Sequence, residues 1–360
     1  MTGYPLDTAI VHRVYHMFLP QSAGRFQSGR SRAAALALFV GLAAGALSFS
    51  LFPFTRGADF AQFHYHARHW LAGRDPYVGG FPVMRATRVV PEPLFYPFPT
   101  VIALAPFALL PLRAAAAAFI AVCTALLAYA VARTSEERLP LFLGSGFLVA
   151  VGLGQWSPLV TATFLLPAVS WLAVLKPNLG LATTAARPNW IGILGGALVL
   201  TGSLVLHPHW PAEWIRNLRS MPSHPAPIFT PGGVVLLLAL TRWRRPEARL
   251  IATMACVPQL MYFADQLPLW LVPRTRREAM ALSAISIIAW AAALVLELRA
   301  GRQPAFDSGG FVLVGVYLPA LVMVLRRPNE GTVPDTIQRL AGLLPPMLRG
   351  REPADRPSQA

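Results

Sequence analysis

The feature that most constrains this chain is the length of its uncharged segments. Residues 33 to 54 carry no charged side chain, and Lys176 is the only charge between Arg138 and Arg187. A helix of about 20 apolar residues is long enough to cross the hydrocarbon core of a bilayer. Only 13% of the residues are charged, compared with about 25% in a typical soluble domain. The sequence therefore predicts an all-α integral membrane protein.

Apolar segments recur along the chain and predict a polytopic helix bundle. After the first segment, others follow at 97–112, 114–132, 139–153, 157–175, 190–206, 229–241, 248–272, 279–298 and 309–326. Several are short or contain proline, which indicates broken helices or half-spans. Residues 178–187 fit either a short span or a loop. We expect roughly 9–11 transmembrane helices.

The basic residues predict how the bundle lies in the membrane. The net charge is +15, but arginines gather between apolar segments, at 242–245, 274–277 and 325–327. The positive-inside rule accounts for such clusters, so nucleic acid is not an expected partner. The predicted organisation is a cytoplasmic segment at 1–30, a membrane domain at 31–327 with an outer loop at 55–98, and a polar, partly disordered tail at 328–360.

The predicted outer loop opens with an unusually polar stretch, GADFAQFHYHARHWLAGRDPYVGG at residues 57–80. Its spacing predicts an amphipathic helix in the membrane interface, because two sets of residues repeat at helical intervals. The apolar face holds Phe60, Phe63, Ala67, Trp70 and Leu71, and the polar face holds Asp59, Gln62, His66 and His69. Gly73 is placed to end this helix, and Asp75-Pro76-Tyr77 predicts a turn.

Two interpretations of Asp59 follow from its position at the helix start. The carboxylate either accepts free backbone N–H groups as an N-cap or acts as a catalytic base at the membrane face. The neighbouring histidines favour substrate contact over a metal site, because only His66 and His69 share a face. Cys123 and Cys256 lie in apolar runs without ligand-like neighbours. We therefore expect no metal, no cofactor and no disulfide framework.

Isolated polar residues in apolar surroundings are further candidates, because a charge in the bilayer is costly. Lys176, the only lysine of the chain, fits either an ammonium that reaches the interface from a helix end or a cation that binds phosphate. Asp265 fits either a helix cap or a group facing a polar cavity. His207 lies close to Trp210 and Trp214, a pattern typical of a membrane interface.

The loop motifs resemble those of the GT87 family, polytopic glycosyltransferases of the GT-C superfamily. The resemblance is carried by Asp59-Phe60, Leu71-Ala72-Gly73, Asp75-Pro76-Tyr77, Phe95-Tyr96-Pro97, Leu109-Leu110-Pro111, Gly154-Gln155 and Lys176-Pro177. It is good over residues 55–135, fair to 182 and loose afterwards. Relatives include mycobacterial mannosyl- and arabinofuranosyltransferases.

The resemblance implies a transferase of the bacterial plasma membrane with several spans. It would pass a mannose- or arabinose-like sugar from a polyprenyl-phosphate donor to a lipid-linked or glycan acceptor on the outer face. Asp59 matches the family's essential aspartate, which takes the acceptor proton. As donor- or acceptor-binding residues we predict His66, His69, Arg68, Gln155, Lys176 and Asp265.

Two functions from other classes remain as alternatives. A secondary transporter or lipid flippase would use broken helices with buried Lys176 and Asp265, although the chain shows no internal repeat. A non-catalytic membrane subunit would need no ordered carboxylate in the first loop.

Overall fold

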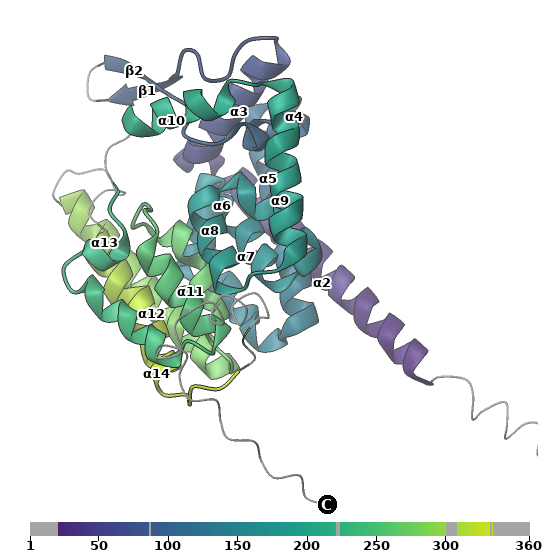
Figure 1. Ribbon diagram of the computed structural model, residues 1–360, viewed down its shortest axis with the longest axis vertical. Helices are drawn as coiled ribbons and strands as arrows, with labels where there is room; N and C mark the ends of the chain where they lie inside the picture. The colour runs from purple at the N-terminus through teal and green to yellow at the C-terminus, as the bar shows by residue number, and fades with distance from the viewer. Residues whose placement is uncertain (1–20, 86–87, 221–223, 300–307, 332, 334–360) are drawn as a thin grey trace, which may run out of the picture.

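The computed structural model describes residues 21–85, 88–220, 224–299, 308–331 and 333. Most of the predicted N-terminal segment and of the C-terminal tail therefore lies outside the described residues. The described chain is almost entirely helical, which confirms the all-α prediction (Figure 1). A single two-stranded sheet accompanies the helices in this part of the chain.

The elements follow one another with short connections. The α-helices are α2 (Gln21–Thr55), α3 (Ala58–Leu71), α4 (Phe98–Ala108), α5 (Leu112–Thr134), α6 (Ser145–Leu153), α7 (Ser157–Leu165), α8 (Pro177–Ala186), α9 (Trp190–Leu206), α10 (Trp210–Ser220), α11 (Pro246–Cys256), α12 (Arg276–Arg299), α13 (Gly309–Val312) and α14 (Leu318–Leu325). Tighter or wider helical turns form η1 (Glu136–Leu143), η2 (Pro167–Leu175), η3 (Pro227–Phe229), η4 (Gly233–Arg242), η5 (Phe263–Leu271) and η6 (Leu313–Tyr317).

Three helices among the described residues are long and apolar enough to cross a membrane. They are Gly29–Thr55 of α2, α5 and α12; α9 and α10, bent by 102° at their junction, add a fourth if the pair is one span. The expected count of roughly 9–11 full spans is thus not reached there. Most other apolar segments are broken: 139–153 divides into η1 and α6, 157–175 into α7 and η2, and 248–272 into α11 and η5.

Proline accounts for much of this fragmentation. Pro140 lies inside η1, Pro167 opens η2 and Pro268 lies inside η5. Proline lacks a backbone N–H and clashes with the preceding helical turn, so a continuous α-helix stops or tightens at these positions. The sequence predicted broken helices, but the length of each apolar run led to more full spans than the described residues contain.

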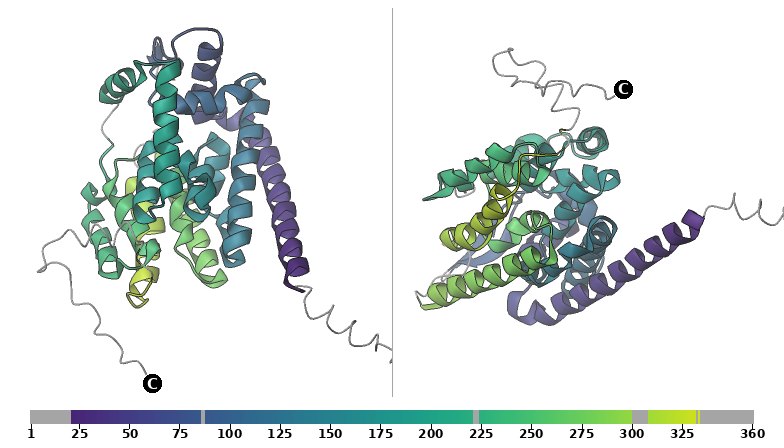
Figure 2. Two further views of the ribbon diagram at one scale, coloured as in Figure 1. Left: turned by 45° about the vertical axis from the view of Figure 1, so that its right-hand side comes forward. Right: turned by 90° about the horizontal axis from the view of Figure 1, so that it is seen from below.

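Glycine brings the first two long helices into close contact. A Cβ atom at Gly41 would lie 2.7 Å from the Ala121 carbonyl oxygen and from Ala125 Cβ, and one at Gly45 would lie 3.0 Å from Ala117 and Ala121. Gly41 and Gly45 form a G-x-x-x-G pattern facing an alanine-rich side of α5. Small residues at this spacing let helix backbones approach closely in membranes, so α2 packs along α5 (Figure 2).

Short helices form the centre of the molecule. Every residue of α7 and every residue of η5 is buried, including the polar Asp265 and Gln266 of η5. Trp156, beside the start of α7, and Trp270 of η5 are among the largest fully buried side chains. Trp270 donates a hydrogen bond to Ser283 of α12 at 3.1 Å. These central elements and their connections bring three of the predicted site residues close together.

The predicted outer loop contains a β-hairpin that the sequence did not predict. Strands β1 (Phe81–Arg85) and β2 (Arg88–Glu92) pair antiparallel, with Phe81 opposite Glu92. Pro82 faces Pro91 in this register, and proline is usually found only at sheet edges. Both strands of a two-stranded sheet are edges, so the pair of prolines is tolerated there.

The basic clusters meet at one end of the molecule. Arg242 donates to the Arg327 carbonyl oxygen at 2.7 Å, Arg327 pairs with Glu278 at 2.5 Å, and Arg276 N–H donates to Glu137 at 2.8 Å. Arg32 of α2 pairs with Glu136 at 3.7 Å near this end. Helix α3, the hairpin and α10 lie at the opposite end (Figure 1). This arrangement agrees with the predicted separation of basic segments from the first loop.

Candidate functional site

A sharp turn places Asp59 at the start of α3. Arg56 and Gly57 both have left-handed backbones, with φ angles of 54° and 55°, and this conformation is uncommon for a residue other than glycine. Gly57, not Asp59, is the N-cap, and no side chain caps the helix. The N-cap interpretation of Asp59 is therefore wrong. Its carboxylate lies in the first helical turn, where the helix dipole favours a negative charge.

Four of the predicted residues form one hydrogen-bonded network. Gln155 Nε2 donates to Asp59 Oδ2. Lys176 Nζ donates to Gln155 Oε1 at 2.7 Å and pairs with Asp265 Oδ1 at 2.5 Å. The four side chains come from α3, the α6–α7 connection, the η2–α8 junction and η5. The sequence identified each residue as a candidate, and the structure brings them together.

The network is buried at one end and accessible at the other. Lys176 is 3% exposed, and Gln155 and Asp265 are each 7% exposed, whereas Asp59 is only partly buried. Lys176 is thus not an interfacial ammonium at a helix end, because its side chain is enclosed and paired. The same geometry places it behind Gln155 rather than at an open surface. Asp59 is therefore the member best placed to meet a substrate.

Glycine and proline set the positions of the two central residues. Gly154 ends α6 with φ of 74°, and a Cβ there would lie 2.4 Å from Phe60 Cβ. Only glycine allows this close approach, which brings Gln155 beside α3. Lys176 lies between η2 and α8 and caps both, and Pro177 is the first residue of α8. Thr100 fixes the same break by donating to the Leu175 carbonyl oxygen at 2.7 Å.

The surroundings of Asp59 favour its neutral form. Desolvation raises the pKa of Asp59 to about 6, although Lys176 and the Gln155 hydrogen bond lower the pKa, while Asp265 and Glu92 raise it. Asp59 lies on α3, outside the helices that are long enough to span. A carboxyl group with a pKa of about 6 is largely ionised at pH 7 and binds a proton far better than an ordinary aspartate, as a general base requires.

Aromatic rings surround the network. Phe63 packs edge-on against Tyr96 with ring centres 4.5 Å apart, and Phe119 packs against Trp156 at 4.8 Å. Tyr96 lies next to Lys176. Tyr96 belongs to a motif of the sequence but was not predicted as a site residue. Its position in the Phe95-Tyr96-Pro97 motif was the available signal.

The histidines of α3 do not join this network. His66 is 1% exposed, and its Nδ1 donates to the Pro76 carbonyl oxygen at 2.8 Å. Burial lowers the pKa of His66 to about 4, so the ring is neutral at pH 7. His69 packs on Tyr65 with ring centres 4.1 Å apart. The polar face of the predicted amphipathic helix is therefore partly buried, and His66 holds the following turn.

Arg68 lies away from the end of α3 that carries Asp59. Its side chain is exposed, and it stands about 13 Å further along the helix axis than Asp59, at 1.5 Å per residue. The predicted end of the helix and the predicted turn are both present. Gly73 has φ of 72° directly after the helix, and Asp75 accepts a hydrogen bond from Tyr77 N–H at 2.8 Å.

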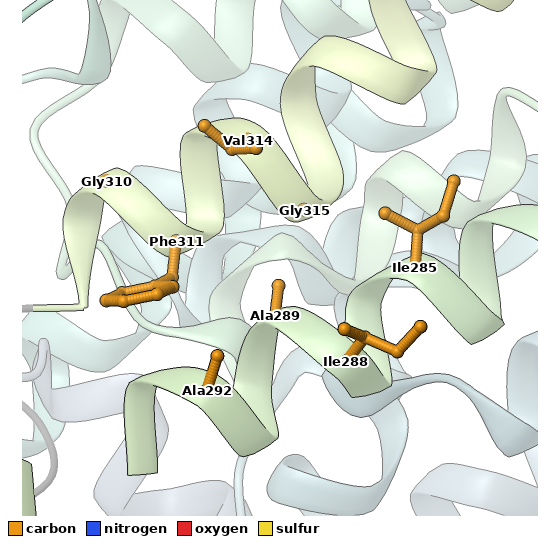
Figure 3. Close-up of a pocket in the computed structure, with 8 residues that line it drawn as sticks. All are labelled: Ile285, Ile288, Ala289, Ala292, Gly310, Phe311, Val314 and Gly315. Carbon is orange, nitrogen blue, oxygen red and sulfur yellow. The ribbon is translucent and has the colours of Figure 1, made fainter. Parts of the chain in front are cut away.

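An apolar groove of about 560 Å³ lies elsewhere, between α12 and the segment Gly309–Leu325 (Figure 3). Its lining side chains are all apolar: Ile285, Ile288, Ala289, Ala292, Phe311 and Val314, with the backbones of Gly310 and Gly315. A Cβ at Gly315 would lie 2.3 Å from Ala289 Cβ, so this glycine sets the helix spacing. No network residue lines the groove, and it supplies no chemical group.

Comparison of the chain with protein families, curated proteins and solved structures finds no match. The resemblance to GT87 enzymes therefore rests on short motifs alone.

Proposed function

We propose that this chain is a polytopic membrane glycosyltransferase with Asp59 as its general base. It would transfer a sugar from a polyprenyl-phosphate donor to a lipid-linked or glycan acceptor at the outer face of a bacterial plasma membrane. One observation supports this most: the carboxylate of the partly buried Asp59, with its raised pKa, is held by a buried chain of Gln155, Lys176 and Asp265. Asp59, Gln155 and Lys176 each stand in a motif that resembles the family.

In the proposed reaction, the acceptor hydroxyl oxygen attacks the anomeric carbon of the donor sugar. Asp59 takes the hydroxyl proton as the new C–O bond forms. The bond between the anomeric carbon and the phosphate oxygen breaks, and polyprenyl phosphate leaves with the electron pair. Gln155 occupies Oδ2 of Asp59, so Oδ1 is the oxygen assigned to the acceptor.

The buried pair gives Gln155 its orientation. The donor nitrogen and the acceptor oxygen of a side-chain amide have similar shapes and positions, so the group can lie in two flipped orientations unless its two hydrogen-bond partners differ. Lys176 is a donor only, so it fixes Gln155 Oε1 toward the ammonium and Nε2 toward Asp59. Asp265 fixes the ammonium in turn. Lys176 is thus proposed as a positioning residue, which replaces its expected contact with the donor phosphate.

The substitution Asp59→Asn tests the proposal directly. Asparagine keeps the size of the side chain but does not accept a proton at neutral pH, so sugar transfer should fall by about 100-fold or more. Transfer from polyprenyl-phosphate sugars is measured in purified membranes, per folded molecule. Glu136→Gln, at the opposite end of the molecule, is the control and should keep its activity. An active Asp59→Asn protein, or a wild type inactive with every donor, contradicts the proposal.

A transporter is the second candidate, because the Lys176–Asp265 ion pair is buried beside a carboxylate that titrates near neutral pH. Buried ionisable residues in membrane proteins often mark proton or substrate pathways. In proteoliposomes, a transporter would couple proton movement to solute movement without forming a glycosidic bond. A transferase would form the product in detergent, where no gradient exists.

A further inference from the structure

A second group of titratable side chains lies at the end of the molecule that carries α3 and the hairpin. Asp75 follows α3, His207 occupies the bend between α9 and α10, and Glu213 lies in the first turn of α10. His207 Nε2 is 2.8 Å from Glu213 Oε2 and 3.5 Å from Asp75 Oδ1. All three ligand atoms lie within 4.8 Å of one another. No local pattern in the sequence indicates this group, because Asp75 and His207 are far apart in the chain.

The two closest atoms are not joined by a hydrogen bond. Both His207 Nε2 and Glu213 Oε2 are shielded from solvent and have no aligned hydrogen-bond partner among the described residues, although they lie 2.8 Å apart. Buried polar atoms normally have a partner, and leaving them without one is costly. Two such atoms pointing into one small space are well arranged to share a cation.

Neighbouring groups hold the three ligands in place. The His207 ring stacks on Tyr77 with ring centres 5.9 Å apart, and Phe98 packs edge-on against it at 5.2 Å. Asp75 Oδ1 is fixed by the Tyr77 N–H at 2.8 Å. Helix α10 is tied to the first loop by Trp214, which donates to the Phe95 carbonyl oxygen at 2.9 Å. Supporting contacts of this kind orient ligands in metal sites.

We propose that Asp75, His207 and Glu213 bind a divalent transition-metal ion such as Zn²⁺. Zinc binds imidazole nitrogen and carboxylate oxygen at about 2.0–2.2 Å in tetrahedral sites, which separates ligand atoms by about 3.3–3.6 Å. The separation of 3.5 Å between His207 Nε2 and Asp75 Oδ1 lies within this range. The separation of 2.8 Å between His207 Nε2 and Glu213 Oε2 is shorter, so a bound ion would move these two atoms apart by about 0.5 Å, and water completes the coordination. An imidazole ligand favours a transition metal over Mg²⁺ or Ca²⁺, which prefer oxygen ligands.

The ion would join the first loop to the bend between α9 and α10. From Tyr77 the connection continues to the candidate site, because the Tyr77 hydroxyl donates to the Tyr96 carbonyl oxygen at 2.8 Å. Tyr96 lies next to Lys176. The proposed role is structural, so the metal site does not depend on the proposed glycosyltransferase activity.

Metal binding is tested on the full-length protein, purified in detergent without a histidine tag and stripped with a chelator. Zn²⁺ is added, the excess is removed by dialysis, and bound metal is counted by mass spectrometry and titration calorimetry. We expect one ion per chain and a rise in the apparent melting temperature of about 2 °C or more, because a ligand that binds only the folded state stabilises it. His207→Ala and Glu213→Gln should each lower Zn²⁺ affinity at least about 100-fold.

His209→Ala is the matched control, because His209 is exposed and lies two positions away, outside the cluster. This variant should bind Zn²⁺ like the wild type. The proposal is overturned if the wild type retains no Zn²⁺, or if retention survives the combined His207→Ala and Glu213→Gln substitutions. If a single variant fails to fold, Asp75→Asn supplies the same comparison of affinity from a different element.

Discussion

The raised pKa of Asp59 leads to a prediction about pH at the scale of the single residue. A general base must be ionised, so kcat/KM for sugar transfer should rise with pH, with a midpoint near the Asp59 pKa of about 6, and level off above it. The effect on stability has the opposite sign. Because the folded-state pKa lies above the unfolded value, the protonated carboxyl group favours folding at low pH, and this contribution is lost as the pH rises through about 6.

The pH profile is measured with purified protein from pH 4.5 to 8, with Asp59→Asn as the comparison. The variant's residual rate should show no inflection near the same pH. An inflection that persists in Asp59→Asn assigns the titration to another group.

A second prediction at the residue scale concerns the Lys176–Asp265 pair. Lys176→Met or Asp265→Leu alone leaves one buried charge without its partner, which should cost about 3–5 kcal/mol of unfolding free energy. The combination of both substitutions replaces two buried charges by apolar groups, so it should cost much less than the sum. Unfolding in mixed detergent micelles measures this, and purely additive losses would show that the pair has no coupling. Activity should fall in all three variants, because Gln155 loses its orientation.

At the scale of the elements, Gly154 is the residue on which the site geometry most depends. Gly154→Ala introduces a side chain into a left-handed backbone and against Phe60, so we expect a loss of about 1–3 kcal/mol of stability. Transfer activity per folded molecule should also fall, since Gln155 moves away from Asp59. Gly152 in the same helix is the control, because a Cβ there meets only Thr55 at an ordinary 3.5 Å.

Gly152→Ala should be neutral or should stabilise α6 by about 0.5–1 kcal/mol, since alanine favours helix more than glycine does. Thermal unfolding and transfer assays on the two variants measure both effects. Equal behaviour of the two alanine variants would show that the turn at Gly154 does not position the site.

The sequence predicted elements better than it predicted their contacts. The apolar run at 190–206 matches α9, and that at 279–298 lies within α12, because a long uncharged run suits a single helix. The hairpin was missed, since Pro82 and Pro91 oppose strand formation in any local pattern. The sequence indicated each of the four network residues separately, as an unusual polar residue: Asp59, Gln155, Lys176 and Asp265. Their pairing depends on where the broken helices turn, which no local pattern records.

At the scale of the whole molecule, the structure separates two chemically different ends. One end gathers arginines from α2, η1, η4, α12 and the segment after α14, and the other carries α3, the hairpin and α10. This second end also carries arginines, among them Arg68 of α3, Arg85 and Arg88 of the hairpin, and Arg216 and Arg219 of α10, but they are spread over three elements and are not clustered between spans. Clustered arginines between spans favour the cytoplasmic side, so we expect the candidate site to lie near the outer face.

Cysteine labelling of intact cells tests this orientation. The exposed thiol of Cys256 is first replaced by serine, and the buried Cys123 is kept. Val78→Cys, at a position 68% exposed beyond α3, should react with an impermeant thiol reagent in intact cells. Glu330→Cys, exposed beyond α14, should react only after the membrane is made permeable. The reversed pattern would place Asp59 on the cytoplasmic side, where an acceptor at the outer face is out of reach, and would contradict the proposed reaction.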